Sequence, residues 1–433
     1  MFTIKNHLLF QKVLVYDLKR IIINSLRYYT NPPNLPELDL NYLCNSNNHE
    51  EISNNITSRK GVGDIKRVLN LKSKLDTINV TDKNYESLQR ELCTELLRIP
   101  NRTHPDVAAL QDEPKIIRLI GDKKVFDFKV REFFEIAKRL NLIRTEQLGN
   151  VSGSRSYFVL GEMAELEQAL IKYTIEKLQK RNFNFISVPD ILNREIIERC
   201  GLNTRGNRAQ VYSLEPKMYG PDLCLSGTSE MAMGGYLINK TFSVDQLPIK
   251  FAAVSRCYRA EISSTAEERG IYRVHHFTKV EMFAVTVPEQ SDQLLEEFRS
   301  IEEKSFGSLG LHLQTLDMPP HELGAPAYRK YDIEAWLPGR NMFGEISSCS
   351  NCTDYQSRRL GIKYKSNDGL RYVHTLNGTA CAIPRMLIAL TETYQTNKGV
   401  IEIPEVLQKY MSNKKFIGKQ KKIPELKLVK HKK

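Results

Sequence analysis

The stretch from Arg259 to Glu281 constrains the fold of this chain more than any other part of the sequence. It has two strand-like ends, Ser255–Glu261 and Tyr272–Val280, joined by a short polar loop that Gly270 closes. Side chains of a strand point to one face at every second residue, so one face would carry Arg259, Glu261, Phe277, Lys279 and Glu281. A guanidinium, an aromatic ring and carboxylates on one face suit a nucleotide with a small zwitterion beside it.

Three other segments accompany this hairpin. Ser226–Glu230 reads Ser-Gly-Thr-Ser-Glu, Phe343–Arg359 begins Phe-Gly-Glu-Ile-Ser-Ser-Cys-Ser-Asn, and Leu376–Gln395 begins Leu-Asn-Gly-Thr-Ala-Cys-Ala-Ile-Pro-Arg. In this order the four segments resemble the Thr-x-Glu loop and motifs 2 and 3 of class II aminoacyl-tRNA synthetases, and within that class the seryl enzymes. A charged hairpin alone is an ordinary surface feature, so the resemblance depends on all four segments.

The resemblance covers most of the chain, from about Leu97 to Tyr410. Tyr272–Phe283 and residues 327–339 look most like the animal mitochondrial form. The resemblance implies an α+β fold, in which a class II catalytic domain with an antiparallel sheet flanked by helices follows a shortened antiparallel helical arm. It also implies an activity, the ATP-dependent activation of L-serine to seryl-adenylate and the transfer of serine to mitochondrial tRNA(Ser).

By motif match, Arg259 would bridge the serine carboxylate and the α-phosphate of ATP, where bidentate geometry favours arginine over lysine. Phe277 would stack beneath adenine and Arg385 would cover its other face, so Arg259 and Arg385 are the candidate catalytic residues. Glu345 and Ser348 would hold Mg²⁺, which prefers oxygen ligands. The candidate ATP-binding residues are Arg259, Ala260, Glu261, Val274, His275, His276, Phe277, Glu345, Ile346, Ser347, Ser348 and Arg385.

Serine differs from alanine by one hydroxyl group, and buried polar partners reject an analogue that would leave them unpaired. The resemblance implies that Thr228, Glu230 and Glu281 read the ammonium and hydroxyl groups of serine. Taken singly, each of these carboxylates is more often a solvated strand residue. The candidate serine-binding residues are Thr228, Ser229, Glu230, Arg259, Glu281, Asn377 and Thr379.

The resemblance also sets the expected order of domains. Motif 1 builds the dimer interface in class II enzymes, and Pro189 within its strand pattern favours a sheet edge or a bulge. We therefore expect a homodimer. The expected parts are an arm in residues 31–110, a connecting segment in 111–150 and a catalytic domain in 151–412, with motif 1 near 183–192, motif 2 at 255–283 and motif 3 at 376–395.

Two helical patterns precede the catalytic domain, at about 63–76 and 82–98, each with one apolar side. They predict an antiparallel hairpin in the place where seryl enzymes carry a long coiled-coil arm that grips tRNA. At 1.5 Å per residue each helix would reach only about 25 Å, so the arm is short. A packing hairpin with no role in RNA binding is the alternative.

Both ends of the chain are basic and account for its net charge of +12. Residues 1–30 interleave basic and apolar side chains and contain one acid, Asp17, which is typical of a mitochondrial presequence and predicts import into the matrix. A structural N-terminal helix is the alternative. Residues 413–433 form a basic tail whose modest apolar content predicts disorder, and the tail could serve solubility or contact the tRNA backbone. Charges interrupt every apolar run, so we expect no membrane span.

Cys349 and Cys352 form the one close pair among eight cysteines. A structural zinc site needs four ligands, and neither a second cysteine pair nor a histidine couple supplies the other two. We expect both to be packed thiols in a reducing compartment.

The sequence lacks the signature motifs of other classes of nucleotide-binding enzyme. Gly61-Val-Gly63 does not extend into a Rossmann or P-loop motif, and the class I synthetase motifs do not occur. The alternative that stays open is a synthetase-like paralogue that kept the fold and lost activity, and such a paralogue is also a candidate partner. A paralogue of this kind should have lost some of the residues that bind ATP or serine, whereas this chain retains them.

Overall fold

The computed structural model describes residues 36–145, 151–153, 155–206, 209–220, 222–261 and 270–424. The chain divides into two compact units, Met1–Pro36 and Glu37–Lys433, and the second is described here. The expected presequence, residues 1–30, lies outside the described residues, as do the hairpin loop 262–269 and the end of the basic tail, 425–433. Within the described ranges no helix has the length and apolar character of a membrane span.

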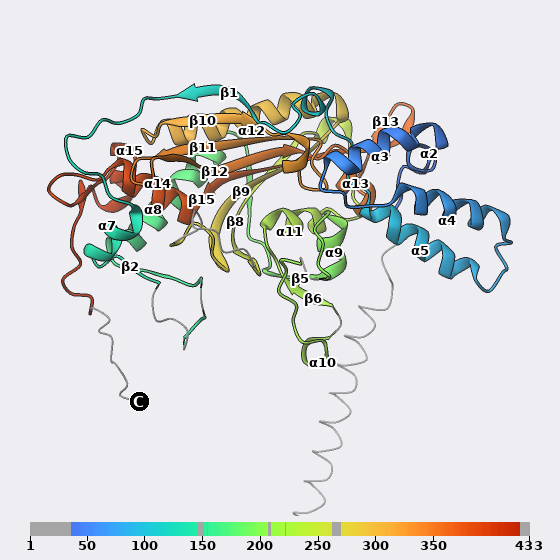
Figure 1. Cartoon of the computed structure of the whole chain (residues 1–433), viewed down its shortest axis with the longest axis horizontal. Helices are drawn as coiled ribbons and strands as arrows, with labels where there is room; N and C mark the ends of the chain where they lie inside the picture. The colour runs from blue at the N-terminus through green and yellow to red at the C-terminus, as the bar shows by residue number, and fades with distance from the viewer. Residues whose placement is uncertain are drawn as a thin grey trace, which may run out of the picture. The chain divides into compact units, whose positions relative to one another are not determined.

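An eight-stranded sheet forms the centre of this unit, in the order β1-β10-β11-β12-β15-β9-β8-β4 (Figure 1). Neighbouring strands pair antiparallel except β4 and β8, which run parallel at one edge. The antiparallel sheet that the sequence predicts is therefore confirmed. Its strands are β1 (Lys115–Ile120), β4 (Asn184–Ile186), β8 (Ile249–Tyr258), β9 (His276–Thr286), β10 (Leu313–Asp317), β11 (Arg329–Leu337), β12 (Met342–Asn351) and β15 (His374–Ala382).

β8 and β9 form the predicted hairpin, with Cys257 opposite Phe277. The first strand ends at Tyr258, earlier than expected, but the backbone N–H of Arg259 still donates to the carbonyl of His275 at 2.9 Å. Arg259 therefore remains beside the sheet although it lies beyond the end of β8.

Side chains of β9 alternate between two hydrophobic clusters on opposite faces of the sheet. Val280 and Met282 belong to one cluster, and Phe283 and Val285 belong to the other. This period of two follows from the pleat of a strand. It leaves Glu281 on the face of the second cluster, as the sequence predicts.

Helices cover the two faces unequally (Figure 1). α8, α12 and α14 contribute to the first and larger cluster, whereas α9, α11 and α13 contribute to the second. The second set leaves part of its sheet face open, and the candidate site lies there. The bounds are α8 (Glu162–Gln179), α9 (Arg194–Arg199), α11 (Ser229–Tyr236), α12 (Ser291–Gly307), α13 (Tyr355–Leu360) and α14 (Ile383–Thr393).

The predicted helical hairpin is confirmed as α4 (Ile65–Thr77) and α5 (Tyr85–Arg98), which lie side by side in Figure 1. The Asp64 side chain caps α4 by accepting from the backbone N–H of Arg67. Together with α3 (His49–Ser58), the two helices enclose a small apolar cluster of their own. This cluster comprises Ile52, Ile56, Ile65, Val68, Leu71, Leu92, Leu96 and Ile99.

The expectation of a disordered tail is wrong for residues 413–424. Phe416–Ile417 forms β17, which pairs with β16 (Ile401–Glu402), and Ile417 is fully buried. The side chain of Asn141 also donates to the carbonyls of Gln420 and Ile423. The sequence did not predict this strand, because a strand of two residues carries almost no periodic signal.

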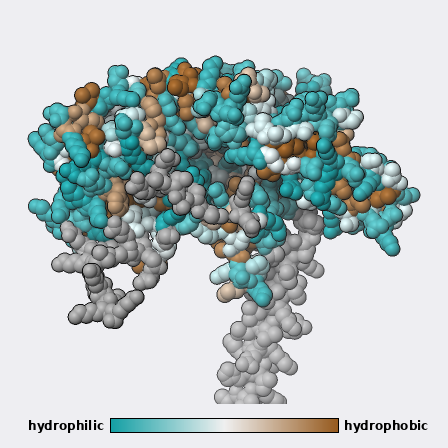
Figure 2. Space-filling model, in the orientation of Figure 1, coloured by the Kyte–Doolittle hydropathy of each residue, from teal (hydrophilic) through white to brown (hydrophobic). Residues whose placement is uncertain are grey.

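The segment 111–150, expected as a connector, contributes β1 to one edge of the main sheet and α7 (Phe133–Arg139) to the larger cluster. Ile116, Ile117 and Leu119 of β1 are exposed, and hydrophobic residues gather where β1 runs (Figure 2). β4 is the last strand of the sheet, but it ends at Ile186, so Pro189 lies beyond it and not within a strand as expected.

Short elements complete the described chain. One small sheet has the order β14-β13-β7, and β2–β3 and β5–β6 pair separately. Their strands are β2 (Ile143–Arg144), β3 (Phe158–Val159), β5 (Ile191–Asn193), β6 (Leu223–Leu225), β7 (Thr241–Ser243), β13 (Lys363–Ser366) and β14 (Gly369–Tyr372). The short helices are α2 (Leu40–Leu43), α6 (Pro105–Ala108), α10 (Pro216–Tyr219) and α15 (Glu405–Gln408).

A fully buried carboxyl group, that of Glu302 on α12, lies beneath the sheet. A Cβ added to Gly378 of β15 would lie 2.9 Å from its Oε1 atom, so a glycine lets the helix approach the strand. Burial raises the pKa of Glu302 well above its ordinary value. There is therefore a pH range in which this carboxyl group is protonated in the folded protein but ionised in the unfolded chain.

This linkage predicts a pH-dependent effect of Glu302→Gln. Below about pH 4 both states of the wild type are protonated, but at higher pH ionisation favours the unfolded chain and lowers stability. Glutamine stays neutral, so the variant should become more stable relative to the wild type as the pH rises from about 4 to 8. Urea unfolding across that range measures the difference.

Glu303, the next residue, is the matched control. Its carboxylate pairs with Arg299 at 2.6 Å and with Arg118 at 3.2 Å, so Glu303→Gln should lower the free energy of unfolding at neutral pH. A stability difference between Glu302→Gln and the wild type that does not change with pH would contradict a protonated Glu302.

Candidate active site

A cavity of about 400 Å³ opens on the sheet face that α9, α11 and α13 leave uncovered. The structure brings nine of the twelve candidate ATP-binding residues to its wall, whereas Ala260, His275 and His276 do not line it. The ring of His276 instead stacks on Tyr157, with centroids 5.7 Å apart. The nine that line it are Arg259, Glu261, Val274, Phe277, Glu345, Ile346, Ser347, Ser348 and Arg385.

The aromatic end of the cavity lies between motifs 2 and 3. The Arg259 guanidinium lies 5.3 Å from the centre of the Phe277 ring, and that of Arg385 lies 4.6 Å from the centre of the Tyr272 ring. Both arginines thus meet aromatic faces, an arrangement that electrostatics favours. Arg385 is placed by α14, whose first turn contains Pro384, a residue preorganised for a helix start.

Glu345 and Ser348 both line the cavity from β12. Burial alone would raise the pKa of Glu345, but the Arg385 and Lys330 charges outweigh it and hold that pKa below its ordinary value. The ion pair between Arg385 Nη1 and Glu345 Oε2 measures 3.1 Å. An ionised carboxylate and a hydroxyl are hard oxygen donors, which suit Mg²⁺ when phosphate and water complete its shell. Among the described residues no group of three His, Cys, Asp or Glu side chains could hold a metal by itself.

Two of the candidate serine-binding residues, Arg259 and Thr379, line the cavity. The others gather behind it. Glu281 is 3% exposed, and its Oε2 accepts from the backbone N–H and, at 2.6 Å, from the hydroxyl of Ser229. Its other oxygen accepts from the hydroxyl of Thr228. Ser229 begins α11, so the carboxylate also lies at the positive end of a helix dipole.

Lys279 lies between this group and the cavity. Lys279 lines the cavity, and its Nζ atom pairs with Glu281 Oε1 at 2.5 Å and donates to the Thr228 hydroxyl at 3.2 Å. Burial alone would raise the pKa of Glu281, but Lys279 and the hydroxyl donors hold it below its ordinary value. Glu281 is therefore a buried carboxylate rather than a carboxylic acid.

Glu230 is the second residue of α11, and its carboxyl group has neutral partners instead. Its Oε1 accepts from the side-chain amides of Gln356 at 2.6 Å and Asn377 at 2.9 Å. Burial raises the pKa of Glu230 above its ordinary value. The site thus holds two carboxyl groups with opposite shifts, one beside a lysine and one beside amides.

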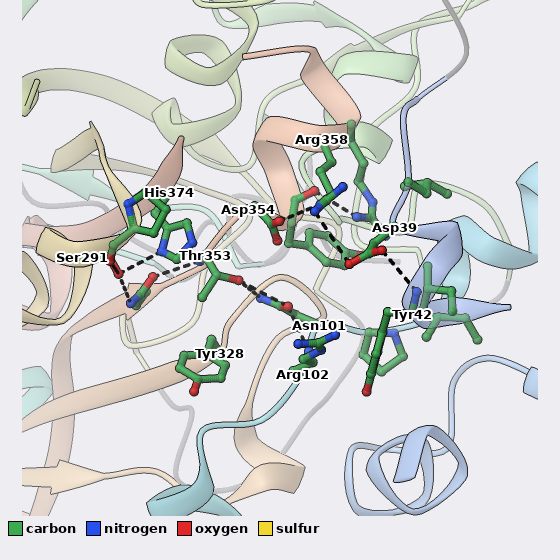
Figure 3. A pocket seen from close by; sticks show the side chains of 18 of the residues that line it. Asp39, Tyr42, Asn101, Arg102, Ser291, Tyr328, Thr353, Asp354, Arg358 and His374 are labelled. Carbon is green, nitrogen blue, oxygen red and sulfur yellow. Dashed lines mark hydrogen bonds and ion pairs between the residues drawn. The ribbon is translucent and has the colours of Figure 1, made fainter. Parts of the chain in front are cut away.

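A second cavity, of about 370 Å³, lies between the N-terminal helices and the catalytic part of the chain (Figure 3). Its charged side chains pair with one another: Arg358 Nε lies 2.6 Å from Asp354, and Arg358 Nη2 lies 3.7 Å from Asp39. The Arg102 guanidinium lies 3.5 Å from the centre of the Tyr42 ring. None of the candidate site residues lines this cavity, and its contacts join α2 to the region of α13.

The sequence pattern did not assign a role to four residues of the site. Lys279 was placed on the correct face by alternation, but its pairing with Glu281 is tertiary. Gln356 and Lys330 lie in regular elements, and no local signal marks either as part of the site. Lys60 lines the first cavity from a position just after α3, far away in the sequence.

Cys349 and Cys352 are free and fully buried, in agreement with the expected packed thiols. Cys352 lies beside the site, because its Sγ atom accepts from the Asn377 amide at 3.5 Å.

Comparison with known proteins agrees with this geometry. Residues 212–394 match the tRNA synthetase class II core domain (G, H, P, S and T). A mitochondrial serine–tRNA ligase from Mus musculus is 46% identical over 328 residues, which are 75% of this chain and 63% of the mouse protein. The chain thus spans less than two thirds of that relative. A serine–tRNA ligase from Treponema denticola is 42% identical over 74% of this chain and 77% of its own length.

Two solved structures share the fold. Seryl-tRNA synthetase from Pyrococcus horikoshii, complexed with ATP, superposes with a TM-score of 0.79 at 27% identity, covering 88% of this chain and 99% of that one. Cytoplasmic serine–tRNA ligase from Naegleria fowleri, in complex with AMP, gives 0.77 at 30% identity, covering 88% and 98%. The chain belongs to the serine–tRNA ligase family of class II tRNA synthetases.

Proposed function

We propose that this protein is a mitochondrial serine–tRNA ligase of the matrix, which activates L-serine with ATP and transfers it to tRNA(Ser). The proposal rests on one observation, that two subsites adjoin each other. A cavity with Arg259, Phe277, Glu345 and Arg385 on its wall meets a buried polar group centred on Glu281. A synthetase-like paralogue that had lost its activity should have lost residues of one of these subsites. This chain retains the candidate residues of both.

In the proposed activation step, a serine carboxylate oxygen attacks the α-phosphorus and pyrophosphate leaves. The protein supplies alignment and positive charge. Arg259 would contact the serine carboxylate and the α-phosphate, and Arg385 would contact the terminal phosphate. Adenine would stack on Phe277, with Glu261 and the backbone of Val274 at its edge.

Glu345 and Ser348 would hold Mg²⁺, which would neutralise charge on the phosphates. The support for this is the donor chemistry, a carboxylate kept ionised beside a hydroxyl. Arg385 orients that carboxylate through the 3.1 Å ion pair. Mg²⁺ commonly binds proteins through one or two side chains together with phosphate oxygens, so two ligands suffice.

Serine selection would use the buried group. The ammonium of serine would exchange with the Lys279 ammonium at Glu281, and the hydroxyl would meet Thr228, Glu230 and the Asn377 amide. Alanine would leave these buried partners without a hydrogen bond, which costs more than a lost methylene contact. Pyrophosphate exchange with each of the twenty amino acids tests the proposal, and exchange with an amino acid other than serine would refute it.

Glu281→Gln should reduce serine-dependent exchange by a few hundredfold, about 2–4 kcal/mol, because it removes a buried charge partner of the ammonium. ATP binding, measured by calorimetry, should persist because Glu281 does not line the ATP cavity. Glu86→Gln, at an exposed position of α5, is the matched control. Equal losses of ATP binding and exchange would show a general structural defect instead.

We propose that the short arm and the end of the basic tail contact tRNA through phosphate charge. Deleting residues 425–433 should leave serine exchange and thermal stability unchanged and weaken tRNA charging more strongly at low salt. Deleting from residue 414 should also lower stability, because it removes buried Ile417 and the pairing of Lys414 with Glu165. Charging that is unchanged at every ionic strength after the shorter deletion would exclude the tail from tRNA binding.

We also propose a homodimer through motif 1. Its support is β4 at the edge of the sheet, with Phe185 45% exposed and Ile191 49% exposed nearby. Replacing both side chains with lysine should convert a dimer to a monomer, as multi-angle light scattering would report. A wild-type monomer with full activity at nanomolar concentration would contradict the proposal. A mixed species with a second synthetase-like chain would indicate the paralogue as partner.

A further inference from the structure

Lys60 lies in the N-terminal helical region but lines the ATP cavity. It follows α3, whereas every other residue on the cavity wall comes from residue 259 onward. The arm region therefore contributes a side chain to a cavity that is otherwise built by the catalytic part of the chain.

The neighbouring Arg59 fixes the position of Lys60. Arg59 is 3% exposed, and its Nη1 donates to the carbonyls of Asn101 at 2.7 Å and Arg102 at 3.3 Å. Its Nη2 donates to the carbonyl of Gly324. Burial lowers the pKa of Arg59 to about 10, which leaves it charged at neutral pH. The end of α3 is thus tied both to the exit of the arm and to the loop after η6 (Pro320–Glu322).

The backbone of Lys60 is held in an unusual conformation. Its φ is +67°, and the N–H of Gly61 donates to the carbonyl of Ile56 at 2.9 Å, closing α3. Glycine is the residue that most often occupies this left-handed position after a helix, and a residue with a side chain is strained there. A lysine at this position is therefore not explained by the needs of the turn.

Charge distinguishes Lys60 from most basic side chains of the cavity. Lys279, Arg273, Lys330 and Arg385 each already pair with a carboxylate. Among the described residues, no ion pair involves Lys60 or Arg259. The four pairs are Lys279–Glu281, Arg273–Glu261, Lys330–Asp332 and Arg385–Glu345.

We propose that Lys60 binds the β- and γ-phosphates of ATP, so that the arm region takes part in serine activation. This proposal rests on the proposed function. Lys60 shares the cavity wall with Glu322 of η6 and Lys330 of β11, and the neighbouring Arg59 binds the loop directly after η6, so Lys60 reaches the cavity near η6. The proposed function assigns Phe277 and Glu261 to adenine and Arg259 to the α-phosphate, which leaves the β- and γ-phosphates as the charge that an unpaired ammonium on this wall would meet.

Lys60 contributes charge and takes no part in proton transfer. As the serine carboxylate oxygen bonds to the α-phosphorus, the bond from that phosphorus to the bridging oxygen breaks. The electron pair leaves with pyrophosphate, whose added negative charge the Lys60 ammonium would offset.

Lys60→Gly tests the role because it removes the charge while suiting the left-handed backbone. The full chain should keep or slightly raise its melting temperature, whereas kcat/KM for ATP in serine-dependent pyrophosphate exchange should fall about tenfold. Lys60→Arg should restore most of the exchange. Lys66→Ala, an exposed lysine of α4 outside the cavity, is the control and should change neither quantity.

The outcomes separate the explanations. Exchange that is unchanged by Lys60→Gly would overturn the proposal, and if tRNA charging fell at the same time, that result would assign the lysine to the tRNA phosphates. A fall in melting temperature for Lys60→Gly and also for Lys60→Asn, which tolerates the same φ, would make the residue structural and overturn it too. A wild-type protein with no serine-dependent exchange would refute the proposed function before Lys60 is considered.

Discussion

Glu281 and Lys279 form a buried ion pair on one strand, and the candidate site is assembled around it. Both side chains are less than one tenth exposed, so their burial costs solvation energy that a single ion pair does not recover in full. The hydroxyls of Thr228 and Ser229 and the N-terminus of α11 supply the additional hydrogen bonds. By joining β9 to α11, the same contacts bring Glu230 to the Asn377 amide on β15.

This arrangement explains how a sheet can hold two subsites of different character. The cavity proposed for ATP is lined with two arginine–carboxylate pairs, whereas the residues around Glu281 are buried. Lys279 stands at the boundary and keeps Glu281 ionised. A buried carboxylate suits an ammonium ligand, and a carboxyl group among amides such as Glu230 suits a hydroxyl.

Local alternation in the sequence was sufficient to predict the sheet face, whereas the strand–helix unit that carries Arg385 was expected from the resemblance to motif 3. Alternation places Phe277, Lys279 and Glu281 on one face because the pleat has a fixed period. The pairing of Lys279, the buried strand at Ile417 and the reach of Lys60 into the cavity were not predicted. Each depends on contacts between segments far apart in the chain, for which neither periodicity nor spacing carries a signal.

The N-terminal helices are joined to the catalytic part by polar contacts on buried backbone rather than by a large apolar interface. Arg59 holds carbonyls at the exit of the arm, and Asn101 donates to the carbonyls of Pro326 and Cys352. Cys352 also contacts Asn377 of the serine group. A short arm can therefore be connected to the site directly, without the length of a coiled coil.

The central claim is that a nucleotide cavity and a serine-selective subsite are adjoined in one chain. Calorimetric titration with a non-hydrolysable seryl-adenylate analogue, compared with its alanyl counterpart, tests both parts at once. The account predicts that the seryl compound binds at least about a hundredfold more tightly, since the alanyl compound leaves buried polar groups unpaired. Equal affinities, or no binding of the seryl compound, would contradict it.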